Sequence, residues 1–135
     1  MKVVLDASAI AKWFLIEDES DKMKKLRNEI AKQNVEAHVP DLIFIEIANL
    51  LRYSKINEKD ISLAIRALMQ IGLIIHRFEE LIYDAIKLAI EKNITVYDSL
   101  YVALSNLIDS PLITYDEILL KSIDKAKKAS EIVKF

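Results

Sequence analysis

Short apolar runs alternate along the chain with longer stretches in which apolar residues recur every three or four positions. The short runs are typical of buried strands, and the longer stretches of amphipathic helices. The pattern predicts strands over residues 2–6, 35–39, 73–78, 111–114 and 131–135. It predicts helices over residues 9–15, 19–33, 40–53, 58–71, 79–92, 97–109 and 117–128. Strands that alternate with helices in this way predict an α/β fold whose mainly parallel sheet is covered on both faces.

The helix starts and exposed faces are also suggested by the sequence. Ser8 is placed to cap the first helix, and Pro40 is expected to open the third, because proline is tolerated in a first turn. The helix over 19–33 is rich in charge and is expected to be largely exposed. The two histidines, His38 and His76, fall in predicted strands and are expected on the strand surface rather than as ligands.

Four carboxylates lie in or directly beside apolar runs that must help to form a core. They are Asp6 in VVLDASAI, Glu46 in DLIFIEIANLL, Asp98 in TVYDSLYVALS and Asp116 in LITYDEILL. Acidic side chains are almost never fully buried unless they are paired. Parallel sheets bind ligands beyond the carboxyl ends of their strands. Asp6 ends the first strand and Asp116 follows the strand 111–114, so both are expected at that edge.

Three of these acids also fit a purely structural role. Asp6 could cap the helix that follows it, since aspartate is a good N-cap residue. Asp98 and Asp116 each precede or open a helix, where a negative charge gains about 0.3–1 kcal/mol from the helix dipole. Glu117 stands beside Asp116 and could replace it in any role, so spacing alone does not choose between them.

Glu46 is the acid that a structural role explains least well. Its helical neighbours four residues away are Leu42 and Leu50, so it does not belong to a polar face. A buried glutamate without a partner would cost several kcal/mol or stay protonated. The structural alternative is a core glutamate paired with Arg52 or Asn49.

Taken together, the four acids indicate one shared site for a divalent cation. Clustered carboxylates raise one another's pKa unless a cation balances them. Mg²⁺ and Mn²⁺ suit sites made of oxygen ligands, whereas Zn²⁺ prefers histidine or cysteine. The chain has no cysteine and only two histidines, so a zinc site, a thiol nucleophile and a histidine-based mechanism are all poorly supported.

Length and charge set further limits. The 135 residues suit a single domain over 1–135, and the net charge of −2 excludes a generic polyanion binder. Two basic groups are expected to be solvated helix faces: Lys22, Lys24, Lys25 and Arg27, then Lys121, Lys125, Lys127 and Lys128. No apolar run reaches the ~20 residues that span a bilayer, and the N-terminus lacks a signal-peptide core. A soluble, cytoplasmic protein without membrane contact is therefore expected.

The four acidic segments, in their order and spacing, resemble the PIN domain, and in particular the VapC-type toxins of prokaryotic toxin–antitoxin pairs. The segments are VVLDASAIAKW, PDLIFIEIANLL, TVYDSLYVALS and LITYDEILL, and the likeness spans the whole chain. It implies a PIN-like three-layer α/β/α fold with a central five-stranded sheet. It also implies a metal-dependent endoribonuclease that hydrolyses RNA phosphodiester bonds.

The resemblance assigns roles to individual residues. Catalytic metal ligands would be Asp6, Glu46, Asp98 and Asp116, with Asp6 and Asp98 the most direct. The family's Thr-x-Asp pattern maps to Thr114–Tyr115–Asp116, which favours Asp116 over Glu117. Supporting residues around the ligands would be Ser8, Asn49 and Thr114. The cofactor would be Mg²⁺ or Mn²⁺, in one or two copies.

The implied partners are RNA, a cognate VapB-type antitoxin and a second copy of the chain. Phe44, Ile45 and Leu51 lie on helix faces that cannot all turn inward, which fits a homodimer or antitoxin surface. Two alternatives stay open. One is a PIN-fold nuclease of RNA maturation, and the other is a non-enzymatic receiver-like α/β domain, although Asp6 follows Leu5 where receivers usually have a second acid.

Overall fold

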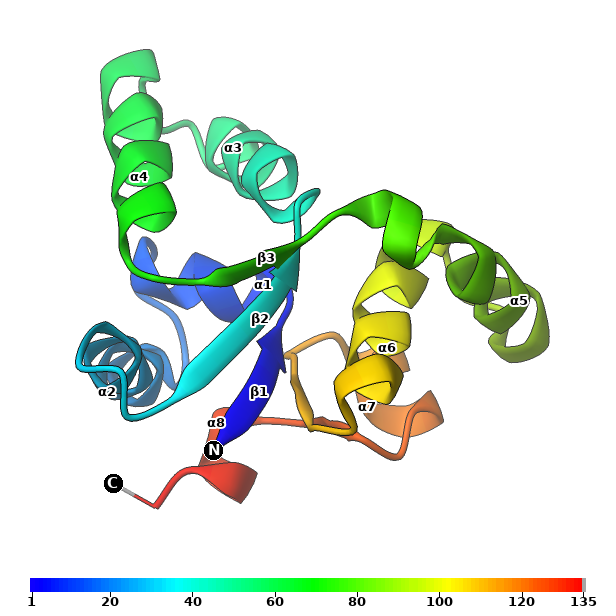
Figure 1. Ribbon diagram of the computed structural model, residues 1–135. Helices are drawn as coiled ribbons and strands as arrows, with labels where there is room; N and C mark the ends of the chain where they lie inside the picture. Colours follow the sequence, from blue (N-terminus) through cyan, green and yellow to red (C-terminus); the bar gives the residue numbers. More distant parts are fainter. Residues whose placement is uncertain (135) are drawn as a thin grey trace.

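A five-stranded, all-parallel sheet forms the centre of the protein, in a computed structural model that describes residues 1–134 (Figure 1). The strand order is β3-β2-β1-β4-β5, and each neighbouring pair is parallel. The strands are β1 Lys2–Leu5, β2 Glu36–Pro40, β3 Ile74–His76, β4 Leu112–Ile113 and β5 Ala126–Lys127. The predicted α/β class and mainly parallel sheet are confirmed.

Helices cover both faces of the sheet. The α-helices are α1 Ala7–Ile10, α2 Ser20–Ala31, α3 Ile43–Tyr53, α4 Glu58–Gln70, α5 Ile82–Lys92, α6 Val96–Ile108, α7 Glu117–Ser122 and α8 Ala129–Ile132. Two short 3₁₀ helices are η1 Ala11–Trp13 and η2 Phe78–Glu80. Figure 1 shows α2 and α4 on one side of the sheet and α5, α6 and α7 on the other, which gives three layers. None of the helices in the described residues is both long and apolar enough to cross a bilayer.

The core lies around β1 and α6. Val3, Val4 and Leu5 are fully buried, as expected for a central strand with helices on both faces. Helix α6 packs against β1 and β2, and all its residues from Ser99 to Ser105 are buried. An acid at the end of β1, between helices on both faces of the sheet, is therefore shielded from water.

Helix α2 is less exposed than its charge suggested. Met23, Leu26 and Ile30 recur at helical spacing and are buried against the core. Lys24 and Lys25 lie on the opposite, exposed face. The expectation of a largely exposed helix was therefore wrong for one face, although a solvated lysine face is present.

The start of the chain differs from the prediction at two points. The first helix begins at Ala7, and its cap is Asp6 rather than Ser8, because the Asp6 carboxylate accepts the Ala9 N–H. Pro40 ends β2 and does not open α3, which begins at Ile43. The next residue, Asp41, donates its N–H to the carbonyl of His76, so β2 stays attached to β3 beyond the proline.

The C-terminal region differs most. The predicted helix over 117–128 ends at Ser122, and the last strand of the sheet is the two-residue β5. The predicted strand 131–135 is wrong up to residue 134, because Ala129–Ile132 forms α8; Phe135 lies outside the described residues. The predicted helix over 79–92 is also divided, into η2 and α5.

Candidate acidic site at the carboxyl edge of the sheet

Asp6 is the most enclosed of the four acids. It directly follows β1 and is only 5% exposed. Its Oδ1 accepts the Ser8 hydroxyl at 2.7 Å and the Ala9 N–H at 3.0 Å, and its Oδ2 accepts the Thr114 hydroxyl. Burial raises the pKa of Asp6 to about 6, although these three hydrogen bonds lower it; the charge of Asp98 raises it a little further. The capping role is therefore real, but it does not account for the burial.

Ser8 and Thr114 join the ends of β1 and β4. Their hydroxyl oxygens are 3.3 Å apart, and both donate to the Asp6 carboxylate. The Ser8 hydroxyl also accepts the Tyr115 N–H at 2.8 Å, and the Thr114 hydroxyl accepts the Asp116 N–H at 3.1 Å. These contacts fix the loop after β4 against the loop after β1. They explain why Ser8 is not the helix cap, since its hydroxyl is already engaged.

Asp116 opens α7 beside this loop. Its Oδ1 accepts the Leu119 N–H at 3.0 Å, which caps the helix. Asp116 is half-buried, whereas Glu117 is exposed. The charge of Asp116 contributes to the raised pKa of Asp98. Of Asp116 and Glu117, Asp116 is therefore the residue that interacts with the other acids.

Glu46 lies on α3 and is bound to a tyrosine. The Tyr101 hydroxyl donates to Glu46 Oε1, and Tyr101 is 1% exposed. Burial raises the pKa of Glu46, the Tyr101 hydrogen bond lowers it, and the charges of Asp6 and Asp98 raise it again. The proposed pairing with Arg52 or Asn49 is wrong, because Tyr101 is the partner.

Tyr101 was not predicted as a site residue from the sequence. A tyrosine within the apolar run SLYVAL is typical of a core residue, so it carried no functional signal. Two observations could have identified it. Tyr101 follows Asp98 by three residues and shares its helix face, and a buried phenol usually needs a hydrogen-bond partner.

Asp98 stands in the first turn of α6. Thr95 caps this helix by accepting the Asp98 N–H at 3.0 Å. Burial, followed by the charge of Asp116, raises the pKa of Asp98, while the Thr95 hydroxyl lowers it. The charge of Asp98 in turn raises the pKa values of Asp6 and Glu46.

The four predicted acids thus converge from four separate segments. Repulsion between carboxylates raises the pKa of one partner in each of four pairs. The pairs are Asp6–Glu46, Asp6–Asp98, Glu46–Asp98 and Asp98–Asp116. Within residues 1–134, no group of three or more Asp, Glu or His side chains stands in a geometry that could hold a metal ion. The four carboxylates would therefore have to turn before three of them could meet at one ion.

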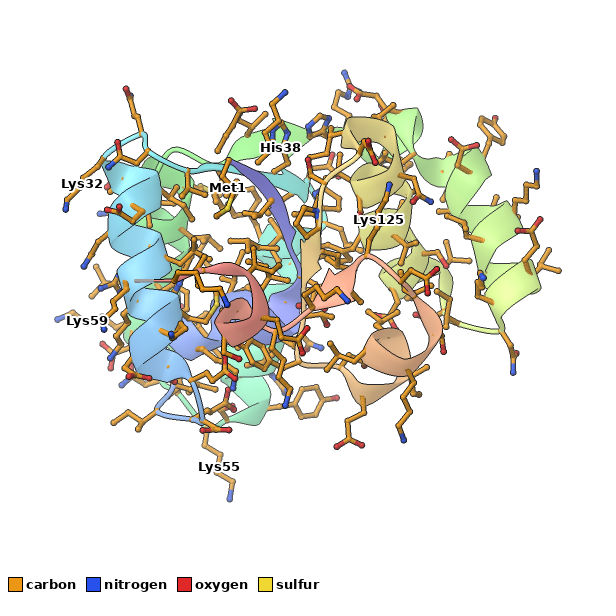
Figure 2. All side chains as sticks on the ribbon, turned by 90° about the horizontal axis from the view of Figure 1, so that it is seen from below. Met1, Lys32, His38, Lys55, Lys59 and Lys125 are labelled. Carbon is orange, nitrogen blue, oxygen red and sulfur yellow. The ribbon has the colours of Figure 1, made fainter. Side chains whose placement is uncertain are left out.

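Two other predicted features lie outside the cluster. Asn49 is exposed on α3, and within the described part of the chain its side chain makes no hydrogen bond to the acids. His38 is buried rather than on the surface, and its Nδ1 lies 2.8 Å from Nε2 of His76. Glu36 and Glu80 flank this pair at 2.7 and 3.4 Å. Figure 2 shows His38 on the side of the molecule where Met1 lies.

Comparisons with known proteins agree on one family. Residues 3–126 match the family model of the PIN domain. The chain is 35% identical over 125 residues to ribonuclease VapC3 of Pyrobaculum aerophilum, which covers 88% of this chain and 92% of the relative.

Two solved structures are similar to this chain in fold. Mycobacterium tuberculosis VapC20, described as a toxin that cleaves the sarcin–ricin loop, gives a TM-score of 0.70 at 11% identity over 91% of this chain and 97% of that one. VapBC2 of Rickettsia felis, solved with a promoter DNA fragment, gives 0.64 at 15% identity over 95% and 98%. At these identities the likeness concerns the fold alone.

Proposed function

The chain belongs to the PIN-domain family, and from this membership we propose that it is a VapC-type endoribonuclease that uses Mg²⁺ or Mn²⁺ to hydrolyse RNA. The likeness to ribonuclease VapC3 over most of both chains supports the activity. The observation that carries the site assignment is the convergence of Asp6, Glu46, Asp98 and Asp116 from four segments. This membership also argues against the receiver-like alternative.

The chemistry of the cluster fits a hard divalent cation. Its donors are carboxylate oxygens, which Mg²⁺ and Mn²⁺ prefer. Burial and mutual repulsion raise the pKa values of Asp6, Glu46 and Asp98, and a cation would relieve both effects. Asp6 accepts three hydrogen bonds, and because a carboxylate has about four acceptor sites, it keeps room for about one further ligand.

Each residue then has a distinct task. Asp6 and Asp98 would hold the ion most directly, and Glu46 and Asp116 would complete the site directly or through water. Ser8 and Thr114 keep the Asp6 carboxylate in place, which is the usual role of residues around a metal ligand. The ion, when bound, supplies Lewis acidity, which lowers the pKa of a water and offsets charge on the phosphate. Attack by water in line with the leaving O3′ would yield a 5′-phosphate and a 3′-hydroxyl.

The partners belong to the same proposal. In a toxin–antitoxin pair the chain would bind a VapB-type antitoxin and would form a homodimer. Of the three apolar residues singled out on the third helix, Leu51 is buried, Phe44 is half-buried and Ile45 is 69% exposed. Ile45 lines an apolar groove of about 620 Å³ with Phe78, Ile82, Val96, Tyr97 and Leu100. An exposed apolar groove of this kind supports a protein partner.

A nuclease of RNA maturation would use the same acids and remains the second candidate. The two roles differ in the partner. Co-purification of the chain with the product of an adjacent short reading frame, and loss of RNA cleavage in that complex, would favour the toxin.

The activity is tested by incubating cellular RNA with the purified protein and Mn²⁺, then mapping the new RNA ends by sequencing. We expect cleavage by the wild type, none in EDTA, and loss of cleavage in Asp6→Asn and Asp98→Asn. Asp124→Asn is the matched control and should cleave normally, because Asp124 is an exposed acid outside the cluster. Cleavage that is unchanged in both aspartate variants would contradict the site assignment.

A further inference from the structure

A lysine lies at the same edge of the sheet as the acids. β5 pairs in parallel with β4, with Ile113 beside Lys127, and the Thr114 N–H donates to the Lys127 carbonyl at 3.0 Å. Lys128 follows β5 directly, as Thr114 follows β4. Because the carboxyl ends of parallel strands share one edge, the fold brings Lys128 next to the loop that carries Asp116.

A second lysine completes a pocket there. Lys121 lies on α7, the helix that Asp116 caps. Lys121 and Lys128 line a pocket of about 340 Å³ together with Tyr115, Glu117 and Leu120. Tyr115 belongs to both sites, since its backbone N–H binds the Ser8 hydroxyl that supports Asp6. The pocket therefore adjoins the acid cluster through one shared residue.

The Tyr115 side chain, which lines the pocket, is fixed by contacts on its hydroxyl and its ring. Its hydroxyl donates to Glu19 Oε1 at 2.8 Å and accepts the Ala129 N–H at 3.2 Å. The ammonium group of Lys12, itself buried, lies 4.3 Å from the centre of the Tyr115 ring. Because its hydroxyl and one ring contact are fixed by the protein, Tyr115 offers a rigid surface rather than a mobile side chain.

The C-terminal basic group is thus not one uniform solvated face. Lys125, labelled in Figure 2, pairs with Asp109 at 2.9 Å. Lys127 is exposed and does not line the pocket. Within residues 1–134, Lys121 and Lys128 form no ion pair with a carboxylate. Two acids act on them: Glu117 lines the pocket, and the charge of Lys128 lowers the pKa of Glu19. Neither acid is within ion-pair distance of these lysines, so both ammonium groups keep their donors for a ligand.

We propose that this pocket binds a backbone phosphate of the RNA strand next to the bond that is cleaved, an inference that rests on the proposed ribonuclease function. The chain carries a net charge of −2, and its four clustered acids repel RNA. Phosphate contacts supply most of the affinity of proteins for nucleic acids and position the strand. Lys121 and Lys128 provide such contacts beside the acids, and Tyr115 provides the wall along which the strand leaves.

The test compares two matched pairs of lysine substitutions. Lys121→Gln/Lys128→Gln removes the pocket charges, and Lys24→Gln/Lys25→Gln removes two exposed charges from α2. Both are made in an Asp6→Asn background that prevents cleavage. Binding of a fluorescein-labelled single-stranded RNA oligonucleotide of mixed sequence is followed by fluorescence anisotropy over a range of salt concentrations. Circular dichroism of each variant confirms that it is folded.

We expect the pocket variant to bind RNA about tenfold more weakly. The slope of log K against log salt concentration should become shallower by about 0.7, the contribution of one phosphate contact to a single strand. The α2 variant should stay within about twofold of its parent, because its charges lie outside the pocket. Lys121→Arg/Lys128→Arg should restore binding. With Asp6 intact, the pocket variant should show a raised KM and an almost unchanged kcat.

The outcomes separate this inference from the proposed function. Suppose that the wild type cleaves RNA, and that the pocket variant and the α2 variant have equal KM values and equal slopes of log K against log salt concentration. The pocket then does not bind the strand, and the ribonuclease function stands. If the wild type does not cleave RNA but the pocket pair alone weakens binding, the pocket stands and the proposed function falls. If the parent protein does not bind RNA at all, the inference is overturned.

Discussion

The buried Asp6 carboxylate makes a strong prediction about stability. The pKa of Asp6 rises from its ordinary value of 3.8 to about 6 in the folded protein, chiefly because of burial. Ionising Asp6 therefore costs the folded state about 3 kcal/mol more than it costs the unfolded chain. The folded state binds this proton more tightly, so stability contributed by Asp6 is present below pH 3.8 and is lost as the pH rises to about 6.

Asp6→Asn removes this cost while keeping the size of the side chain. The asparagine oxygen can still accept the Ser8 hydroxyl and the Ala9 N–H, whereas the Thr114 hydroxyl must find a new acceptor, at a cost of about 1 kcal/mol. We therefore expect Asp6→Asn to be more stable than the wild type by about 1–3 kcal/mol at pH 7 in EDTA. Near pH 4 the advantage should disappear, because the wild-type carboxyl is then protonated.

The assay is urea denaturation followed by circular dichroism, at a series of pH values from 4 to 7 in EDTA. Asp124→Asn, which neutralises an exposed acid, controls for the general effect of losing one negative charge. Added Mn²⁺ should stabilise the wild type more than Asp6→Asn, because only the wild type keeps the full set of acids. A difference between the two proteins that does not change from pH 4 to pH 7 would refute the reasoning.

Three further predictions concern the neighbours of the acids and the apolar groove. Tyr101→Phe removes the hydrogen bond to Glu46 and should weaken Mn²⁺ binding several-fold in calorimetry. The free energy of unfolding should change by about 1 kcal/mol or less. Wild-type Mn²⁺ affinity in this variant would contradict a role of Tyr101 in positioning Glu46. Thr114→Val removes a buried hydroxyl that serves two partners and should cost about 1–3 kcal/mol of stability in urea denaturation; an unchanged midpoint would show that neither bond matters. Ile45→Asp should convert a dimer into a monomer in light scattering, and a monomeric wild type at micromolar concentration would refute the dimer.

The sequence predicted the parts of the fold that long-range packing does not decide. Val3, Val4 and Leu5 form an apolar run directly before Asp6, and the helix 97–109 is long and periodic. Both elements therefore appeared within one or two residues of their predicted bounds. β5 has only two residues and carries no periodicity, so nothing local marks it as a strand. Ile132 and Val133 are β-branched and favour a strand, but they follow β5, the last strand of the sheet in the described residues.

The sequence predicted which acids belong to the site, but not the hydrogen bonds that link them to other segments. The misplaced acids were visible because a carboxylate in an apolar run is costly. Tyr101 was not visible, because its partner Glu46 is 55 residues away and only the fold brings them together. Ser8 suited two local roles, as a helix cap or as a support for Asp6. Pro40 also suited two, as a helix start or as a strand end. In both cases tertiary contacts decided: Tyr115 engages Ser8, and β3 pairs with Pro40.

The central claim is that Asp6, Glu46, Asp98 and Asp116 act as one metal site. Calorimetric titration with Mn²⁺ tests it most directly, on the wild type, the four single amide variants of these acids, and Glu117→Gln. We expect each of the four substitutions to weaken Mn²⁺ binding and Glu117→Gln to leave it unchanged. Wild-type affinity in all four variants, or equal losses in the Glu117→Gln control, would contradict it.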